Sequence, residues 1–343
     1  MSNICIAIDA MGGDLGPKIT VPAALKALAE YPDLHLILVG DQIELTKMLS
    51  AKKPKWDKTR LQIHNTTQVV AMDEAPASAL RGKRDSSMRV ALNLVHQGTA
   101  QACVSAGNTG ALMATARFVL KMLPGVDRPA ILFPIPSRLG VVYMLDLGAN
   151  VDCLPEHLFQ FAVMGSVLVA STSDNSNPKV GLLNIGSEAI KGNEVVKQTA
   201  LLLQDVQDLN YIGFVEGDDI YKGTADVVVC DGFVGNVALK ASEGVAKLLV
   251  SISREEFTRN WWSKLAALIC TPVLKRVFDR TDLNKYNGAS LLGLRGVVIK
   301  SHGGAKVEAF NTAIKKAIRA AEMNVPEKIR AAVAAKLGEA DSV

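Results

Sequence analysis

The stretch ICIAIDAMGGDLG, residues 4–16, decides the fold of this 343-residue chain. Its apolar beginning, Ile4–Ile8, predicts a buried strand that ends at the carboxylate of Asp9. A glycine-rich turn follows, and Val21–Glu30 then has the spacing of a helix that packs one apolar face. The next apolar run, Leu34–Val39, completes a strand–turn–helix–strand unit, which indicates parallel strands.

The same alternation continues along the chain. Further strands are predicted at Leu61–His64, Ala102–Ser105, Val141–Asp146, Lys179–Leu183, Tyr211–Phe214 and Val227–Cys230. Further helices are predicted at Ser87–Gln97, Ala111–Lys121, His157–Ala170, Glu194–Leu203, Val237–Ser251 and Lys306–Met323. No linker or repeat interrupts the pattern, so we predict one α/β domain over residues 1–343, a three-layer α/β/α sandwich with a mostly parallel sheet.

Composition excludes several classes of protein. With 49% hydrophobic and 21% charged residues, the chain is not a disordered one, and its net charge of +4 is weak for a nucleic-acid binder of this size. The five cysteines are widely spaced and form no C-x-x-C pair, which argues against disulfides and favours a cytoplasmic protein. The longest apolar stretch, Leu158–Ala170, is shorter than the ~20 residues of a membrane-spanning helix.

Polar, glycine-rich turns follow five of the predicted strands. They occupy residues 9–17, 105–110, 146–152, 184–192 and 231–236. If all strands are parallel, these turns meet at one edge of the sheet, where open α/β sheets bind ligands. Glycine lets backbone N–H groups approach a ligand, and helix N-termini attract anions, so we expect a cleft for an anionic substrate.

Familiar catalytic motifs are absent, and two readings of the turn residues stay open. There is no G-x-G-x-x-G, Walker A, G-x-S-x-G or H-E-x-x-H motif. The aspartates of the turns either cap helices and turns, which we favour, or hold a divalent metal. Cys103, Cys153 or Cys230 could serve as a nucleophile, although small buried cysteines are also common at strand ends.

One segment departs from the α/β pattern. Residues 257–280 read FTRNWWSKLAALICTPVLKRVFDR, with Trp261 and Trp262 among basic residues. We predict a helical hairpin inserted at residues 252–285 and kinked or divided at Pro272. Such a mixture of tryptophan and basic side chains suits an anionic membrane surface or an acidic protein partner, whereas the alternative is a dimer-packing helix pair.

The turns resemble those of a known family, the PlsX acyl-acyl-carrier-protein:phosphate acyltransferases. The similar segments come in the same order, at 8–17, 104–111, 146–152, 183–186, 230–236 and from 286–289 through 300–303. The resemblance extends from residue 4 to about residue 325 and departs slightly at Gly186-Ser187-Glu188-Ala189, where a more acidic run is expected. The resemblance implies a dimer with the fold of phosphotransacetylases and of isocitrate and isopropylmalate dehydrogenases. We expect no cofactor and no metal.

The implied reaction is attack of inorganic phosphate on the thioester of a long-chain acyl carrier protein, giving acyl phosphate for a downstream glycerol-3-phosphate acyltransferase in phospholipid synthesis. Lys191 and Asn236 are the expected catalytic pair, and Asn108 is an alternative oxyanion donor. Either Lys191 or His302 would protonate the leaving thiolate. The other residues expected to bind phosphate or substrate are Asp9, Gly12, Gly13, Asp14, Ser105, Gly107, Asn108, Thr109, Gly110, Asp231 and His302.

Three rival functions remain. A short-chain phosphotransacetylase would use acyl-CoA, an isopropylmalate-type dehydrogenase would transfer hydride, and a non-enzymatic scaffold would only dock the carrier protein. We expect a cytoplasmic enzyme with peripheral contact at the inner face of the cell membrane and no nucleic-acid partner.

Overall fold

The run Ile4–Asp9 forms strand β1 near the middle of one half of the sheet, and the elements around it follow the predicted alternation. The computed structural model describes residues 4–51, 57–281 and 283–340. The other strands are β2 (Leu34–Gly40), β3 (Leu61–Asn65), β4 (Ala102–Ser105), β5 (Ala130–Ser137), β6 (Gly140–Leu145), β7 (Val180–Leu183), β8 (Tyr211–Val215), β9 (Val227–Val229), β10 (Ala289–Leu292) and β11 (Val297–Lys300).

The helices connect these strands and extend the chain beyond them. They are α1 (Pro17–Glu30), α2 (Gln42–Ser50), α3 (Pro76–Gly82), α4 (Ser87–His96), α5 (Thr109–Leu120), α6 (Pro155–Thr172), α7 (Glu194–Gln204), α8 (Asp219–Lys222), α9 (Gly232–Thr258), α10 (Trp261–Thr281), α11 (Val307–Glu322) and α12 (Val325–Ala340), with a 3₁₀ turn at Leu283–Tyr286. None of the helices described is long and apolar enough to cross a membrane.

The strands form one 11-stranded sheet in the order β3-β2-β1-β4-β11-β10-β5-β6-β9-β7-β8. Strands β1 to β4 and β11 are mutually parallel, and so are β6 to β9. Between these groups, β10 is antiparallel to both β11 and β5, and β5 is antiparallel to β6. The two groups therefore run in opposite directions, and the prediction that all five polar turns leave one edge of the sheet is wrong.

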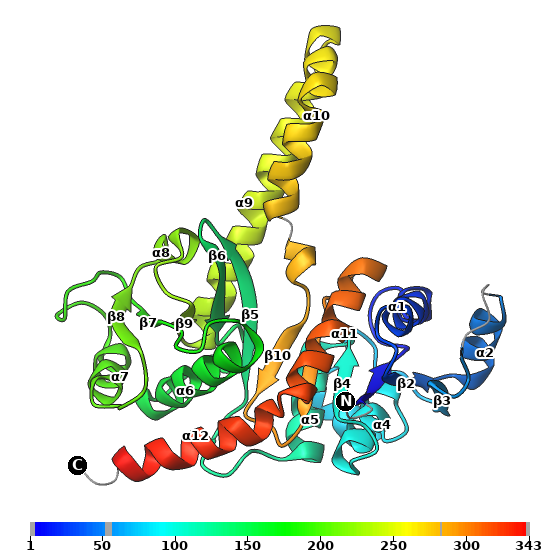
Figure 1. The fold of residues 1–343 in the computed structure, drawn as a ribbon, viewed down its shortest axis with the longest axis horizontal. Coiled ribbons are helices and arrows are strands. Elements are labelled where there is room, and N and C mark those ends of the chain that lie inside the picture. Colours follow the sequence, from blue (N-terminus) through cyan, green and yellow to red (C-terminus); the bar gives the residue numbers. More distant parts are fainter. Residues whose placement is uncertain (1–3, 52–56, 282, 341–343) are drawn as a thin grey trace.

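Helices cover both faces of the sheet, which makes three α/β/α layers (Figure 1). On one face α1, α11, α6 and α12 enclose the largest apolar cluster. On the other face α4 and α5 cover the first group of strands, and α8 with the start of α9 covers the second group. The predicted α/β class with a mostly parallel sheet is thus confirmed.

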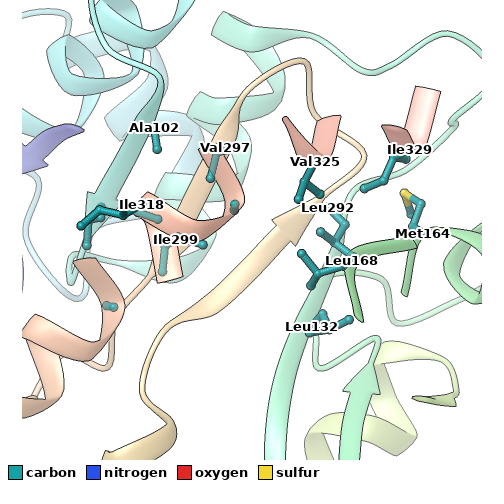
Figure 2. Close-up of a cluster of buried hydrophobic side chains, with 14 of the residues drawn as sticks. Ala102, Leu132, Met164, Leu168, Leu292, Val297, Ile299, Ile318, Val325 and Ile329 are labelled. Carbon is teal, nitrogen blue, oxygen red and sulfur yellow. The ribbon is translucent and has the colours of Figure 1, made fainter. Parts of the chain in front are cut away.

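The two C-terminal helices join the halves of the molecule. Val325 and Ile329 of α12 lie against Met164 and Leu168 of α6, while Ile318 of α11 lies toward the β4 and β11 side chains (Figure 2). This cluster is continuous across the antiparallel strands, so the two groups of strands share one core.

The long helices α9 and α10 contact each other and project away from the sheet (Figure 1). Helix α9 begins at Gly232, well before the predicted hairpin boundary, and includes the helix predicted at Val237–Ser251. Helix α10 runs through Pro272 without interruption, so the predicted division there is wrong. A proline removes one backbone hydrogen bond, and the partner helix α9 stabilises the rest of α10.

Replacing Phe161 with alanine should lower the free energy of unfolding by about 3–5 kcal/mol, as for other buried phenylalanines. Phe161 lies on α6, is fully buried and contacts the largest core cluster. Urea denaturation of Phe161→Ala measures the loss, with Phe118→Ala as control because Phe118 is 52% exposed. A loss as small as that of the control would contradict the packing described.

Candidate active site

The turn after β1 is built around the buried carboxylate of Asp9. The hydroxyls of Ser87 and Ser105 donate to its two oxygens, each over 2.6 Å, and the backbone N–H groups of Met11 and Gly12 also donate to it. Burial raises the pKa of Asp9 above its ordinary value, and these hydrogen bonds oppose the rise. Asp9 therefore stabilises the conformation of this turn through four hydrogen bonds.

The turn after β4 lies directly against the turn after β1. A Cβ atom added to Gly12 would lie 2.4 Å from Asp9 Oδ2 and 2.8 Å from the backbone nitrogen of Gly107. The hydroxyl of Ser105 accepts from that same Gly107 nitrogen, over 3.1 Å. The two turns thus pack backbone to backbone, which is the arrangement an anion-binding cradle needs.

The side chain of Asn108 has hydrogen-bond partners on both sides of its amide group. Its side-chain oxygen caps α5 by accepting from Ala111 N, and its amide nitrogen donates to the carbonyl oxygens of Met72 and Glu74. Both amide hydrogens thus have backbone carbonyl partners in this structure, and the role of Asn108 as an alternative oxyanion donor stays a prediction. Thr109 and Gly110 are the first residues of α5, so their backbone N–H groups have no carbonyl acceptor within the helix.

A third turn, after β11, completes this side of the site. Asp14 N donates to the carbonyl oxygen of Gly303, which joins it to the first turn. The buried amide of Asn287 donates to Ser301 Oγ over 2.7 Å, and its oxygen accepts from His302 N over 3.0 Å. His302 itself is exposed, and its Nδ1 accepts from Gly304 N. Asn287 and Ser301 were not predicted as site residues.

The second group of strands carries its own polar turns, organised by Asp146. This buried carboxylate accepts from the backbone nitrogens of Ile131, Ala149 and Asn150. Burial raises its pKa, and the hydrogen bonds oppose the rise. A Cβ atom on Gly235 would lie 1.9 Å from the Asp146 carbonyl oxygen, so α9 starts in close contact with this turn.

Lys191 and Asn236 lie in this second region. Asp231 caps α9 by accepting from Val234 N over 2.9 Å, and Asn236 is exposed on the first turn of that helix, beside Gly148. Lys191 is exposed on the loop after β7, and the amide of the buried Asn184 donates to its carbonyl oxygen over 3.2 Å. Strands β7 and β9 are hydrogen-bonded neighbours, so the loops that carry the two residues leave adjacent strands.

The structure thus divides the predicted residues into two clusters. The first cluster contains Asp9, Gly12, Gly13, Asp14, Ser105, Gly107, Asn108, Thr109, Gly110 and His302, and the second contains Lys191, Asp231 and Asn236. Met113, on α5, packs against apolar side chains beneath both clusters. Helix α5 therefore links the clusters, although no hydrogen bond among the described residues joins their polar side chains directly.

Three carboxylates of the turns accept hydrogen bonds from the backbone or side chains around them, and two of the thiols are buried. Asp9, Asp146 and Asp231 all accept hydrogen bonds from the turns they stabilise, as the capping interpretation predicts. No group of three metal-ligating side chains occurs among the residues that the structure describes. Burial raises the pKa of Cys103 and Cys230 well above the ordinary thiol value, so reactive thiolates are scarce at both positions.

Comparison with known proteins identifies the family. Residues 4–328 match the family described as "Fatty acid synthesis protein". The phosphate acyltransferase of Halorhodospira halophila is 58% identical over 337 residues, which are 98% of each chain. That of Legionella pneumophila strain Paris is 56% identical over 330 residues, which are 96% of each chain. The chain belongs to the phosphate acyltransferase (PlsX) family.

Solved structures with the same fold are more distant in sequence. A phosphotransacetylase from Streptococcus pyogenes has a TM-score of 0.63 at 17% identity, with 93% of this chain and 94% of that chain covered. The EutD phosphotransacetylase from Staphylococcus aureus has a TM-score of 0.61 at 17% identity, with 94% of each chain covered. The family membership confirms the resemblance drawn from the turns and makes the chain an acyltransferase, while the roles of Lys191, Asn236 and the glycine turns stay predictions.

Proposed function

We propose that this chain transfers a long-chain fatty acyl group from acyl carrier protein to inorganic phosphate. The observation that carries the proposal is 58% identity to a phosphate acyltransferase over 98% of both chains. The products are acyl phosphate and free carrier protein, and the acyl phosphate is then used to acylate glycerol 3-phosphate in phospholipid synthesis.

In the proposed reaction, an oxygen of phosphate bonds to the thioester carbonyl carbon and the carbonyl becomes a tetrahedral oxyanion. Collapse of this intermediate breaks the C–S bond, and the pantetheine thiolate leaves and takes a proton. Phosphomonoesters have a second pKa of ~6, and inorganic phosphate is likewise present in part as a nucleophilic dianion at neutral pH, so the protein needs to position it rather than deprotonate it. The backbone N–H groups of Thr109 and Gly110 at the start of α5 suit this task, because they have no carbonyl partner in the helix.

The second cluster suits the thioester side of the reaction. The exposed amide of Asn236 is available to donate to the oxyanion, and the exposed Lys191 supplies a positive charge or a proton for the departing thiolate. His302 is the alternative proton donor, because its imidazole is exposed at the edge of the first cluster.

The test is phosphate-dependent release of free thiol from palmitoyl carrier protein. We expect release that saturates with phosphate and yields palmitoyl phosphate in equal amount. A short-chain phosphotransacetylase, which the shared fold keeps as the second candidate, would instead prefer acetyl-CoA. Thiol release that is indifferent to phosphate would contradict the proposal, and reduction of a nicotinamide cofactor would favour the dehydrogenase.

The projecting helices α9 and α10 are proposed to be an insertion in a single domain of the isocitrate dehydrogenase type, with a role at interfaces. Trp261 and Trp262 stack on each other and are each 63% exposed, and Arg259 and Lys264 lie beside them in the sequence. Exposed aromatic and basic side chains together favour the surface of an anionic membrane or the acidic carrier protein. Further apolar side chains along both helices support a homodimer, and the proposed location is the cytoplasm with peripheral contact at the inner face of the membrane.

The double change Trp261→Ser, Trp262→Ser should weaken binding to phosphatidylglycerol vesicles at least about tenfold. A large apolar side chain that becomes buried in the membrane contributes roughly 1.5–3 kcal/mol to the binding free energy. Sedimentation with vesicles measures the bound fraction. Phe118→Ser is the matched control, since Phe118 is also an exposed aromatic residue but lies on α5. Wild-type protein that stays wholly in the supernatant would refute the membrane contact.

A further inference from the structure

A row of three polar side chains crosses the sheet beneath the first cluster. Asp9 of β1 is in register with Ser105 of β4, and Ser105 is in register with Lys300 of β11. Register partners in parallel strands point to the same face of the sheet. Here that face is the one covered by α4 and α5, because Ser87 at the start of α4 donates to Asp9. Lys300 therefore lies under the same three turns that form the first cluster.

The Lys300 ammonium is buried and has only neutral partners. Lys300 is 8% exposed, and its Nζ donates to the carbonyl oxygen of Ala106, over 3.4 Å, and to that of Ser301. Burial lowers its pKa to about 8, against the attraction of the Asp9 and Asp14 carboxylates. A group with this pKa is still protonated in about nine of ten molecules at pH 7, so a positive charge lies below the turns.

The Lys300 ammonium forms no ion pair with a carboxylate among the described residues. Among the described residues, no carboxylate lies within ion-pair distance of Lys300, and the Asp9 oxygens are already bonded by Ser87 and Ser105. Burying a lysine without an anionic partner is costly, and an anion bound by the turns above Lys300 would offset that cost. Asp14 is exposed at the edge of the cluster, where a Cβ atom on Gly304 would lie 3.3 Å from its Oδ2, and a positive charge is needed there to offset its repulsion of anions.

We propose that Lys300 is a phosphate-binding residue, whose ammonium supplies the positive charge at the base of the turns after β1, β4 and β11. The proposal rests on the proposed function, since the bound phosphate is the nucleophile of that reaction. The two clusters then have different functions. Lys300 and the glycine turns of the first cluster bind phosphate, and Lys191 and Asn236 of the second cluster act on the thioester.

The test is Lys300→Met, which keeps the length of the side chain and removes the charge. Titration calorimetry with inorganic phosphate should give a dissociation constant about 10- to 100-fold higher than that of the wild type, the usual effect of losing a charge-assisted hydrogen bond. The KM for phosphate in thiol release should rise by a similar factor, while the KM for palmitoyl carrier protein stays unchanged. If Lys300→Met does not fold, as judged by its thermal transition, Lys300→Gln is measured in the same way.

Lys316→Met is the matched control. Lys316 is also buried, with a pKa lowered to about 7, and its Nζ donates to the carbonyl oxygens of Tyr286 and Gly288. We expect Lys316→Met to lose stability but to keep its phosphate affinity. Equal phosphate affinity in wild type and Lys300→Met, or an equal loss in both variants, would overturn the proposal. Failure of the proposed function is a separate result, because wild-type protein would then bind phosphate in calorimetry without releasing thiol.

Discussion

Lys191→Ala and Asn236→Ala are each expected to lower kcat for phosphate-dependent thiol release by about 10²–10³, the range found when one oxyanion donor is removed. Asn236 lies near the start of α9, and Lys191 lies on the loop after the neighbouring strand β7. The prediction is that both side chains act on the same thioester carbonyl group. No ion pair among the described residues engages the Lys191 ammonium, which leaves it available to substrate. Lys191→Arg should not restore the rate, because guanidinium holds its proton too tightly to donate it.

Stopped assays of free thiol at saturating phosphate measure this loss, with the phosphate KM determined in parallel. Lys240→Ala is the control, because Lys240 is exposed on α9 just beyond Asn236 and forms an ion pair with Glu243 on the same helix. We expect the control to retain wild-type kcat. If Lys191→Ala raises the KM for phosphate and leaves kcat unchanged, Lys191 binds phosphate and does not act on the thioester.

Much of the fold follows from local patterns of the sequence. Strand Ala102–Ser105 has the predicted bounds, α4 and α7 differ from prediction by one residue at one end, and α11 differs by one residue at each end. Strand β5 was not predicted, because Pro134 and Pro136 obscure its alternation of apolar residues. The short strands β10 and β11 were not predicted either, so the three antiparallel pairings that reverse the direction of the sheet could not be foreseen.

The residues of the candidate site could also be predicted only where local sequence signals indicate them. The glycine turns and Asp9 could be found from the sequence, because composition and position after a strand are local signals. Lys300 and Asn287 could not, since their importance depends on strand register and on contacts between segments distant in the chain. The opposite direction of the two strand groups likewise places Lys191 and Asn236 on a second set of turns, which Met113 of α5 links to the first set.

Gly12→Ala is expected to lower kcat/KM for phosphate by at least about 10²-fold, the cost that a misplacement of roughly 1 Å has in active sites. The new methyl group would lie 2.4 Å from Asp9 Oδ2 and 2.8 Å from Gly107 N, so the turns after β1 and β4 must separate. Asp9 is held by two serine hydroxyls and cannot simply turn away. The N–H groups that face phosphate would therefore lose their common geometry, whereas the second cluster would not change.

A control substitution at a second glycine distinguishes local distortion by Gly12→Ala from a general loss of stability. Gly82→Ala, at the end of α3, adds a methyl group where no atom lies within 4 Å and should leave kcat/KM and the thermal midpoint close to those of the wild type. Gly12→Ala should keep a cooperative thermal transition and bind phosphate weakly, because the contact that fails is confined to two turns over a sheet whose core is untouched. If Gly12→Ala keeps phosphate affinity and rate within about threefold of wild type, the turns after β1 and β4 do not hold the nucleophile, and the phosphate site must be sought around Lys191 instead.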